Sequence, residues 1–314
     1  MTTPTAVPNA TRTSGAAGTT PATITSVVAS PATCAGKVNA KVDKAKLPIG
    51  DGNVSTTAKC GSFFSCQTSF NGGGASARGP WFNNDGKTWD LTKKGVVHGS
   101  VSWTSKLTVT VSGNDRSIAG NDLPKHATGV FPIGSGEAVA AYDRNPNSIA
   151  EQSVQFTVPA NPTLLAQPAC AGGEVGVLLT GAMLFSPLDA GGRDAVAWEA
   201  QDSCTGHPQN SGIYHYHSVS ACVSDSASGH SSLVGYALDG FGIFGPRGED
   251  GKELTDADLD ECHGHTHTIE WDGKQVSMYH YHATTEYPYV VGCYRGTATR
   301  VVTGGQSKNP PPAP

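Results

Sequence analysis

The feature that most constrains this chain is a phrase of three elements that occurs twice between Gly176 and His282. Each copy has an apolar run ending in Phe-Ser-Pro or Phe-Gly-Pro, then a Cys-X-Gly-His turn, then a Tyr-His-Tyr-His run. Cys204 and Cys262 are 58 residues apart, whereas the two Tyr-His-Tyr-His runs are 65 apart, so the second copy carries an insertion before its last element. We predict a duplicated unit, residues 176–217 and 235–282, whose shared polar side chains are histidines.

Glycine and proline content indicates the fold class. The 39 Gly and 20 Pro favour many turns and short strands over long helices. Alternating runs such as Ser153–Val158 are typical of strands. The sequence therefore predicts a mainly β protein with some α+β character, in which a duplicated β-rich unit has internal pseudo-symmetry and is stapled by disulfides.

Composition divides the chain into four expected regions. Residues 1–33 are rich in Thr, Ala and Pro with a single charge, Arg12, which predicts a disordered linker. Residues 34–120 are predicted to form a β-rich N-terminal part. Residues 121–303 form the expected domain with both copies, and the Pro-rich residues 304–314 a disordered tail.

Charge and hydropathy argue against two classes of partner. Charged residues are 15% of the chain, the net charge is −5, and no Lys/Arg cluster is present, which is unlike a nucleic-acid-binding protein. The longest apolar run, Val175–Phe185, is far shorter than the roughly 18 residues of a membrane span. We therefore expect neither nucleic acid nor a membrane span.

Eight cysteines, an even number, favour disulfides in an oxidising compartment, so we expect a secreted or periplasmic protein. No signal peptide is recognisable, so either one was removed or the chain is cytoplasmic, and we expect removal. Two bridges would staple the two copies, a third would close a small loop, and the fourth follows by elimination: Cys204–Cys222, Cys262–Cys293, Cys60–Cys66 and Cys34–Cys170. Thiolate ligation by Cys204 or Cys262 stays an alternative, because Cys-X-X-His is also a zinc spacing.

The histidines of each Tyr-His-Tyr-His run share one face of a strand, because successive side chains point to opposite faces. A third ligand is expected from the preceding turn. This gives two three-histidine sites, or one shared site if the strands are adjacent: His207, His215 and His217, and His265, His280 and His282. Such imidazole sets suit copper or zinc, one or two ions per chain, and also iron or nickel.

Other polar residues are weaker candidates. His263 and His267 flank His265 and are added as possible metal ligands, although the first copy has no counterpart of either. Asp202 and Asp260 correspond to each other; we predict a catalytic acid or base, with a carboxylate that orients a ligand or caps a turn as the alternatives. Three further histidines stand alone and are expected to be surface or core residues: His98, His126 and His230.

With these motifs in view, the chain resembles the YHYH domain family over about Leu123 to Gly296. The motifs that carry the resemblance are Gly235–Gly240, Gly245–Gly248, Leu259–Cys262, Met278–His282 and Gly292–Gly296. The resemblance implies export and a shared fold, but it transfers no reaction.

The leading hypothesis is a secreted, histidine-rich metal-binding protein. An enzyme is left open, either a hydrolase that uses metal-bound water or a copper oxidoreductase, with an unknown substrate. The alternative is a non-catalytic metal carrier, or an extracellular binding module in which the histidines and tyrosines form a hydrogen-bonded structural layer.

Overall fold

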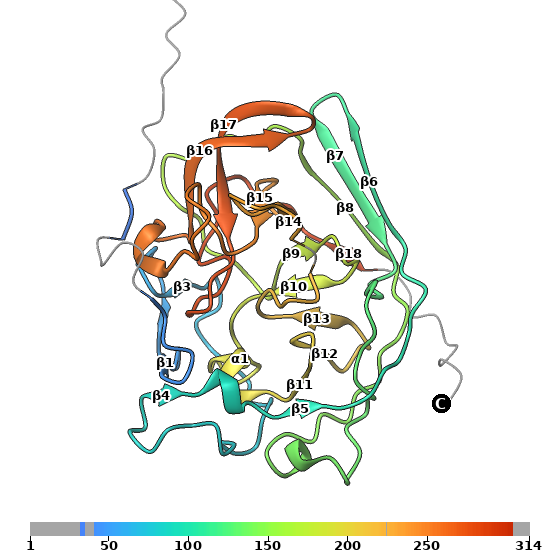
Figure 1. The fold of residues 1–314 in the computed structure, drawn as a ribbon. Coiled ribbons are helices and arrows are strands. Elements are labelled where there is room, and N and C mark those ends of the chain that lie inside the picture. The colour runs from blue at the N-terminus through green and yellow to red at the C-terminus, as the bar shows by residue number, and fades with distance from the viewer. Residues whose placement is uncertain (1–31, 35–40, 224, 304–314) are drawn as a thin grey trace, which may run out of the picture.

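The computed structural model describes residues 32–34, 41–223 and 225–303 (Figure 1). The expected linker falls outside these residues except for its last two positions, and the expected tail falls outside them entirely. Strands dominate the described part, which confirms the mainly β prediction. No helix in that part is long and apolar enough to cross a membrane.

A single eight-stranded sheet occupies the middle of the molecule, with the strand order β12-β13-β10-β9-β14-β15-β17-β16 (Figure 1). The strands come from both copies of the repeated phrase. They are β9 (Glu174–Leu178), β10 (Met183–Phe185), β12 (Gly206–Pro208), β13 (Tyr214–Tyr216), β14 (Leu233–Ala237), β15 (Gly242–Phe244), β16 (Gly264–Trp271) and β17 (Lys274–His282).

The order of this sheet is symmetrical about its centre. Strands β9 and β14 are antiparallel neighbours, and Val177 lies opposite Tyr236, its counterpart in the second copy. Outward from this pair, β10 runs parallel to β13 and β15 runs parallel to β17. Strands β12 and β16 form the two edges of the sheet, where β12 is antiparallel to β13 and β16 is antiparallel to β17. The duplication itself stays a prediction, and this strand order supports it.

A four-stranded antiparallel sheet lies along one side, in the order β18-β8-β7-β6 (Figure 1). It consists of β6 (Leu107–Ser112), β7 (Asp115–Gly120), β8 (Val154–Pro159) and β18 (Val302–Thr303). Strand β7 pairs with β8 along its whole length, so hydrogen bonds cross the expected boundary at residue 120. That boundary stays a prediction.

The remaining elements are short. Strand pairs link β1 (Leu47–Pro48) with β4 (Thr88–Trp89), β2 (Val54–Ser55) with β3 (Phe63–Phe64), and β5 (Val96–Val97) with β11 (Gln201–Asp202). The helical pieces are α1 (Ala195–Trp198), η1 (Leu91–Lys93), η2 (Ala138–Ala141) and η3 (Asp256–Asp258). Helix α1 is capped by Asp194, which accepts a hydrogen bond from the Ala197 N–H. The same carboxylate accepts bonds from the Gly50 N–H and the Tyr289 hydroxyl, so distant segments fix the helix in place.

The tyrosines of the Tyr-His-Tyr-His runs form part of one large hydrophobic core. Each is almost fully buried: Tyr214, Tyr216, Tyr279 and Tyr281. Their hydroxyls all reach hydrogen-bond partners, as buried polar groups require. The tyrosine face of each strand therefore anchors the sheet, which leaves the opposite face to the histidines.

All eight cysteines are paired, so a thiolate ligand is excluded. Cys204–Cys222 and Cys262–Cys293 form as predicted. The other two predictions are wrong, because the observed bridges are Cys34–Cys60 and Cys66–Cys170. The reason is a long-range pairing: the Cys66 N–H donates to the Ala171 carbonyl and brings Cys66 beside Cys170, which sequence proximity to Cys60 does not reveal.

Candidate metal centres

Cross-strand pairing brings the predicted ligands together. His207 on β12 lies directly opposite His215 on β13, and His265 on β16 lies directly opposite His280 on β17. The ring centroids of these pairs are 4.6 and 4.8 Å apart. The histidine that follows each Cys-X-Gly turn therefore lies beside the two histidines of the Tyr-His-Tyr-His run in its own copy. The predicted ligands thus form two separate groups.

The first cluster is His207, His215 and His217, all of them buried. The Nε2 atom of His217 is 3.2 Å from the Nε2 atoms of both His207 and His215. An ion held tetrahedrally at 2.0–2.1 Å separates its ligand atoms by about 3.3 Å. Three imidazole nitrogens thus already converge at the spacing of a single metal site.

Backbone carbonyls orient the rings in the same way in both copies. Each histidine of a Tyr-His-Tyr-His run donates its Nδ1–H to a carbonyl, since a carbonyl oxygen can only accept. The pairs are His215 with Ile213, His217 with Ser186, His280 with Met278, and His282 with Gly245. The Nε2 atoms are therefore left unprotonated, with their lone pairs available to a metal.

Sequence reasoning missed Glu199, which follows α1 and reaches the first cluster. Its Oε2 atom is 3.5 Å from His207 Nε2 and 3.4 Å from His217 Nε2. The side chain is buried, and Oε2 has no hydrogen-bond partner among the described residues. Burial, reinforced by Asp189 and Asp143, raises the pKa of Glu199 well above its usual range. Nothing in the sequence signals this role, because the second copy has no corresponding glutamate.

Burial also keeps the first cluster neutral. Desolvation lowers the pKa of His207 and His215 well below 6.5 and that of His217 to about 4. Neutral imidazole is the form of histidine that binds metal.

The first cluster opens into a cavity of about 920 Å³. The walls include Glu199 and all three histidines, together with Phe70 and Gly74 from the N-terminal part. Gly74 has a positive φ of +72°, and a Cβ there would lie 3.0 Å from Glu199 Oε1. The N-terminal part therefore packs tightly over the first cluster, a role that the sequence did not indicate.

The second cluster has five histidines: His230, His265, His267, His280 and His282. One ligand nitrogen from each lies within 4.8 Å of all the others. His230 was expected to stand alone, but its Nε2 atom is 3.1 Å from His282 Nε2. It comes from the polar loop before β14, and only the folded chain brings it to the sheet.

The second cluster is short of hydrogen bonds. The Nε2 atoms of His265, His267 and His280 have no partner among the described residues. Burial lowers the pKa of His265 to about 3 and that of His230 to about 4. Unpartnered buried nitrogens call for an explanation, and a bound cation supplies one.

His263 does not join either cluster. It occupies the turn before β16, and its Nε2 atom lies 2.9 Å from Thr284 Oγ1 and 3.6 Å from Asp256 Oδ1. Its predicted role as a ligand therefore has no support from the geometry. Two of the three histidines that were expected to stand alone also lie outside both clusters. His98 contacts Glu137, and His126 contacts the Tyr216 hydroxyl.

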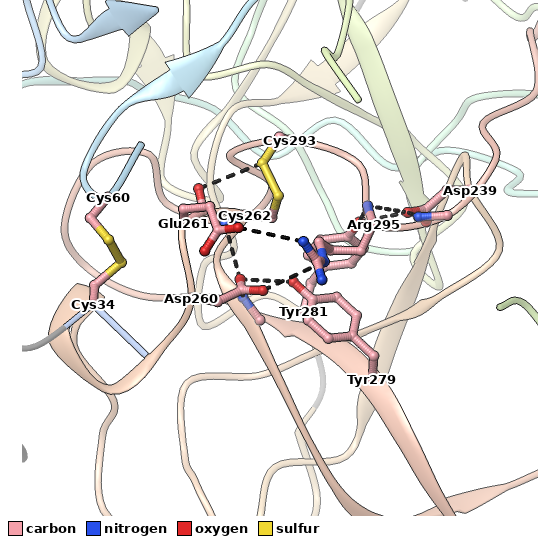
Figure 2. The surroundings of a disulfide bond; sticks show 12 residues. Cys34, Cys60, Asp239, Asp260, Glu261, Cys262, Tyr279, Tyr281, Cys293 and Arg295 are labelled. Atoms are coloured by element: carbon pink, nitrogen blue, oxygen red, sulfur yellow. Dashed lines mark hydrogen bonds and ion pairs between the residues drawn. A yellow bond between two sulfur atoms is a disulfide. The ribbon is translucent and has the colours of Figure 1, made fainter. Parts of the chain in front are cut away.

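Asp202 and Asp260 hold their turns together on the tyrosine side of the sheet. Asp260 accepts bonds from the Cys262 and Gly264 N–H groups and from the Tyr279 hydroxyl (Figure 2). Asp202 makes the equivalent bonds within its own turn and with Tyr214. Burial raises the pKa of both, that of Asp260 to about 6. These contacts match the turn-capping alternative, and the catalytic role stays a prediction without geometric support.

Residues 155–258 match the family model described as YHYH protein. This part of the chain belongs to the YHYH family. The match includes the first Tyr-His-Tyr-His run and ends before the second, so it is narrower than the resemblance drawn from the sequence motifs. No curated protein and no solved structure gives a significant match to the chain.

Proposed function

We propose that this is an exported protein that binds two metal ions, copper or zinc, one at each histidine cluster, and that the first centre is the reactive one. The observation that carries the proposal is the first cluster's convergence. The buried Nε2 atom of His217 lies 3.2 Å from those of His207 and His215, and carbonyls hold the Nδ1 protons of His215 and His217. Four disulfides support export, since such bonds persist in oxidising compartments.

The cavity supports reactivity at the first centre. His207, His215 and His217 would hold the ion, which when bound supplies a Lewis acid that activates water, or a redox couple if it is copper. The chain itself contributes the enclosure, the carboxylate of Glu199 beside the ion, and a cavity large enough for an organic substrate.

A second candidate function, metal carriage or storage, is favoured by the second centre. Five imidazoles can fill the coordination of an ion, which leaves no position for a substrate. Under this alternative the protein holds metal without catalysis, and the first centre behaves in the same way.

The test is elemental analysis of protein purified without chelator, loaded with each metal and desalted. We expect two ions per chain in the wild type and one each in His215→Ala/His217→Ala and His280→Ala/His282→Ala. The matched control is His98→Ala, because His98 is an exposed histidine that lies outside both clusters. A wild-type protein that retains no metal contradicts the proposal.

Reactivity is tested separately on the cobalt(II)-loaded protein. Azide, a small anion that binds open coordination positions, should change the visible spectrum of the first centre and not that of the second. Equal insensitivity of both centres would favour the carrier.

A further inference from the structure

The two clusters differ in the chemistry of their ligand atoms. Three histidines in each cluster occupy corresponding places on the sheet. The first cluster adds the carboxylate of Glu199, and the second adds the imidazoles of His230 and His267. One centre is therefore mixed nitrogen and oxygen, and the other is all nitrogen.

Glu199 Oε2 adjoins two of the three histidine nitrogens of the first centre, but it lies outside the group that the three histidines form. The four measured separations among the three Nε2 atoms and Glu199 Oε2 range from 3.2 to 3.5 Å. The two separations of 3.2 Å between nitrogens are close to the edge of about 3.3 Å expected for bonds of 2.0–2.1 Å. Zinc is bound by histidine nitrogen and carboxylate oxygen in four-coordinate sites.

The second centre offers five nitrogens, more than a tetrahedral ion uses. Opposite ligands of a five-coordinate ion are about 4.2 Å apart at bonds of 2.0–2.1 Å, and the five nitrogens already lie within 4.8 Å of one another. Copper(II) prefers tetragonal surroundings of four or five nitrogen and oxygen ligands.

Nearby acids do not replace Glu199 at the second centre. Asp258 accepts hydrogen bonds from the N–H and hydroxyl of Thr255 and so caps η3. Glu249 lies 3.4 Å from His267 Nδ1, but its side chain is 66% exposed. Among the described residues, the second cluster therefore consists of imidazoles only.

We propose that the two centres hold different metals: zinc at the first, where the Glu199 carboxylate lies beside the three histidines, and copper at the second. This inference rests on the proposed function, because it presupposes that both clusters bind metal. Copper(II) binds nitrogen sites more tightly than zinc does, so both centres favour copper. What differs between them is the ratio of copper affinity to zinc affinity, which is larger at the all-imidazole centre.

The experiment starts from protein loaded with two zinc ions, to which one equivalent of copper(II) is added. We expect one zinc to be released, and the copper to give a tetragonal electron paramagnetic resonance spectrum with imidazole nitrogen couplings. The same spectrum should appear in Glu199→Gln. In His230→Ala/His267→Ala, the copper spectrum should lose its five-nitrogen character while zinc stays at the first centre. This result would locate the copper at the second centre.

The contribution of Glu199 to the zinc site has its own readout. Glu199→Gln should weaken zinc binding at the first centre by about 10- to 100-fold, the range seen when a supporting contact of a metal site is lost. Zinc binding at the second centre should stay unchanged. Glu199→Asp, which keeps a carboxylate, is the matched control and should recover part of the affinity.

The outcomes separate the two proposals. If no zinc loads, the proposed function fails. If zinc loads but copper displaces both ions equally, or if its spectrum changes in Glu199→Gln and persists in His230→Ala/His267→Ala, only the selectivity fails. Unaltered zinc affinity in Glu199→Gln would show that its carboxylate does not contribute to the zinc site. The wild-type spectrum counts imidazoles by itself, so the test stands even if a variant does not fold.

Discussion

The two histidine clusters occupy equivalent places in a symmetrical sheet, yet they differ in every residue beyond the three histidines that they share. Strand register gives each cluster three corresponding histidines. Loops and strand length give the rest: Glu199 follows α1, His230 precedes β14, and His267 lies on the longer edge strand β16. A repeated scaffold thus repeats the backbone, while the connections decide the chemistry.

The insertion in the second copy explains His267. It extends the β16–β17 hairpin to a two-residue turn, Asp272-Gly273, in which both residues have positive φ. Asp-Gly is the favoured sequence for such a hairpin turn. The longer strand places His267 two residues after His265 on the same face, whereas β12 ends one residue after His207.

The largest expected effect concerns the two staples. Replacing the cysteines of Cys204–Cys222 or Cys262–Cys293 by Ala should lower the free energy of unfolding by about 3 to 4 kcal/mol each, because the unfolded chain loses its cross-link. The 31-residue loop of the second bridge should cost about 0.5 kcal/mol more than the 18-residue loop of the first. Urea unfolding measures both, and a reversed order would show that the bridges act through the folded state.

The next largest difference between the two copies is expected in the stability that their buried tyrosine hydroxyls contribute. Tyr281 donates to the Asp239 carboxylate, whereas its counterpart Tyr216 donates to the neutral Thr180 hydroxyl. Removing a hydrogen bond to a charged group costs more, so we expect about 2 kcal/mol for Tyr281→Phe and about 1 kcal/mol for Tyr216→Phe. Urea unfolding of the two variants at pH 7 gives the comparison, and equal losses would contradict it.

The pH dependence of Asp260 provides a smaller contrast. Burial raises its pKa from 3.8 to about 6, so the folded protein holds this proton more tightly than the unfolded chain. Its contribution to stability is therefore present below about pH 4 and lost as the pH rises through 6. Asp260→Asn, which cannot titrate, should therefore become more stable relative to the wild type by about 2 to 3 kcal/mol as the pH rises from 4 to 7.

Asp202→Asn is the control for this measurement, because Asp202 makes the same turn contacts in the first copy. Its relative stability should change in the same direction. Neither variant should lose metal, and loss of metal from either would restore a role for these carboxylates at the centres.

The smallest effect is expected at His263. His263→Asn should leave the metal content at two ions per chain, because the side chain contacts Thr284 and Asp256 and joins neither cluster. Elemental analysis beside the corresponding His265→Asn variant checks this. A similar loss of metal from both variants would show that the turn rearranges on binding.

The repeated phrase determined a large part of this protein by itself. Strand alternation put His215 and His217 on one face and Tyr214 and Tyr216 on the other, because the side-chain period of a strand is two. The correspondence of the copies predicted six histidines that the structure groups into two sets, and it predicted the two bridges that follow them. These are local properties, which spacing along the chain can carry.

Only the tertiary structure decided which other residues meet them. Glu199 and His230 arrive from loops without counterparts, and the pairing of Cys66 with Cys170 depends on a hydrogen bond between segments 104 residues apart. The cavity wall from Phe70 and Gly74 is equally remote in sequence. Such contacts depend on the packing of the whole chain, which no periodicity in the sequence records. The β-rich character and the shared histidines could be predicted from the repeated pattern, whereas the residues that distinguish the two clusters could not.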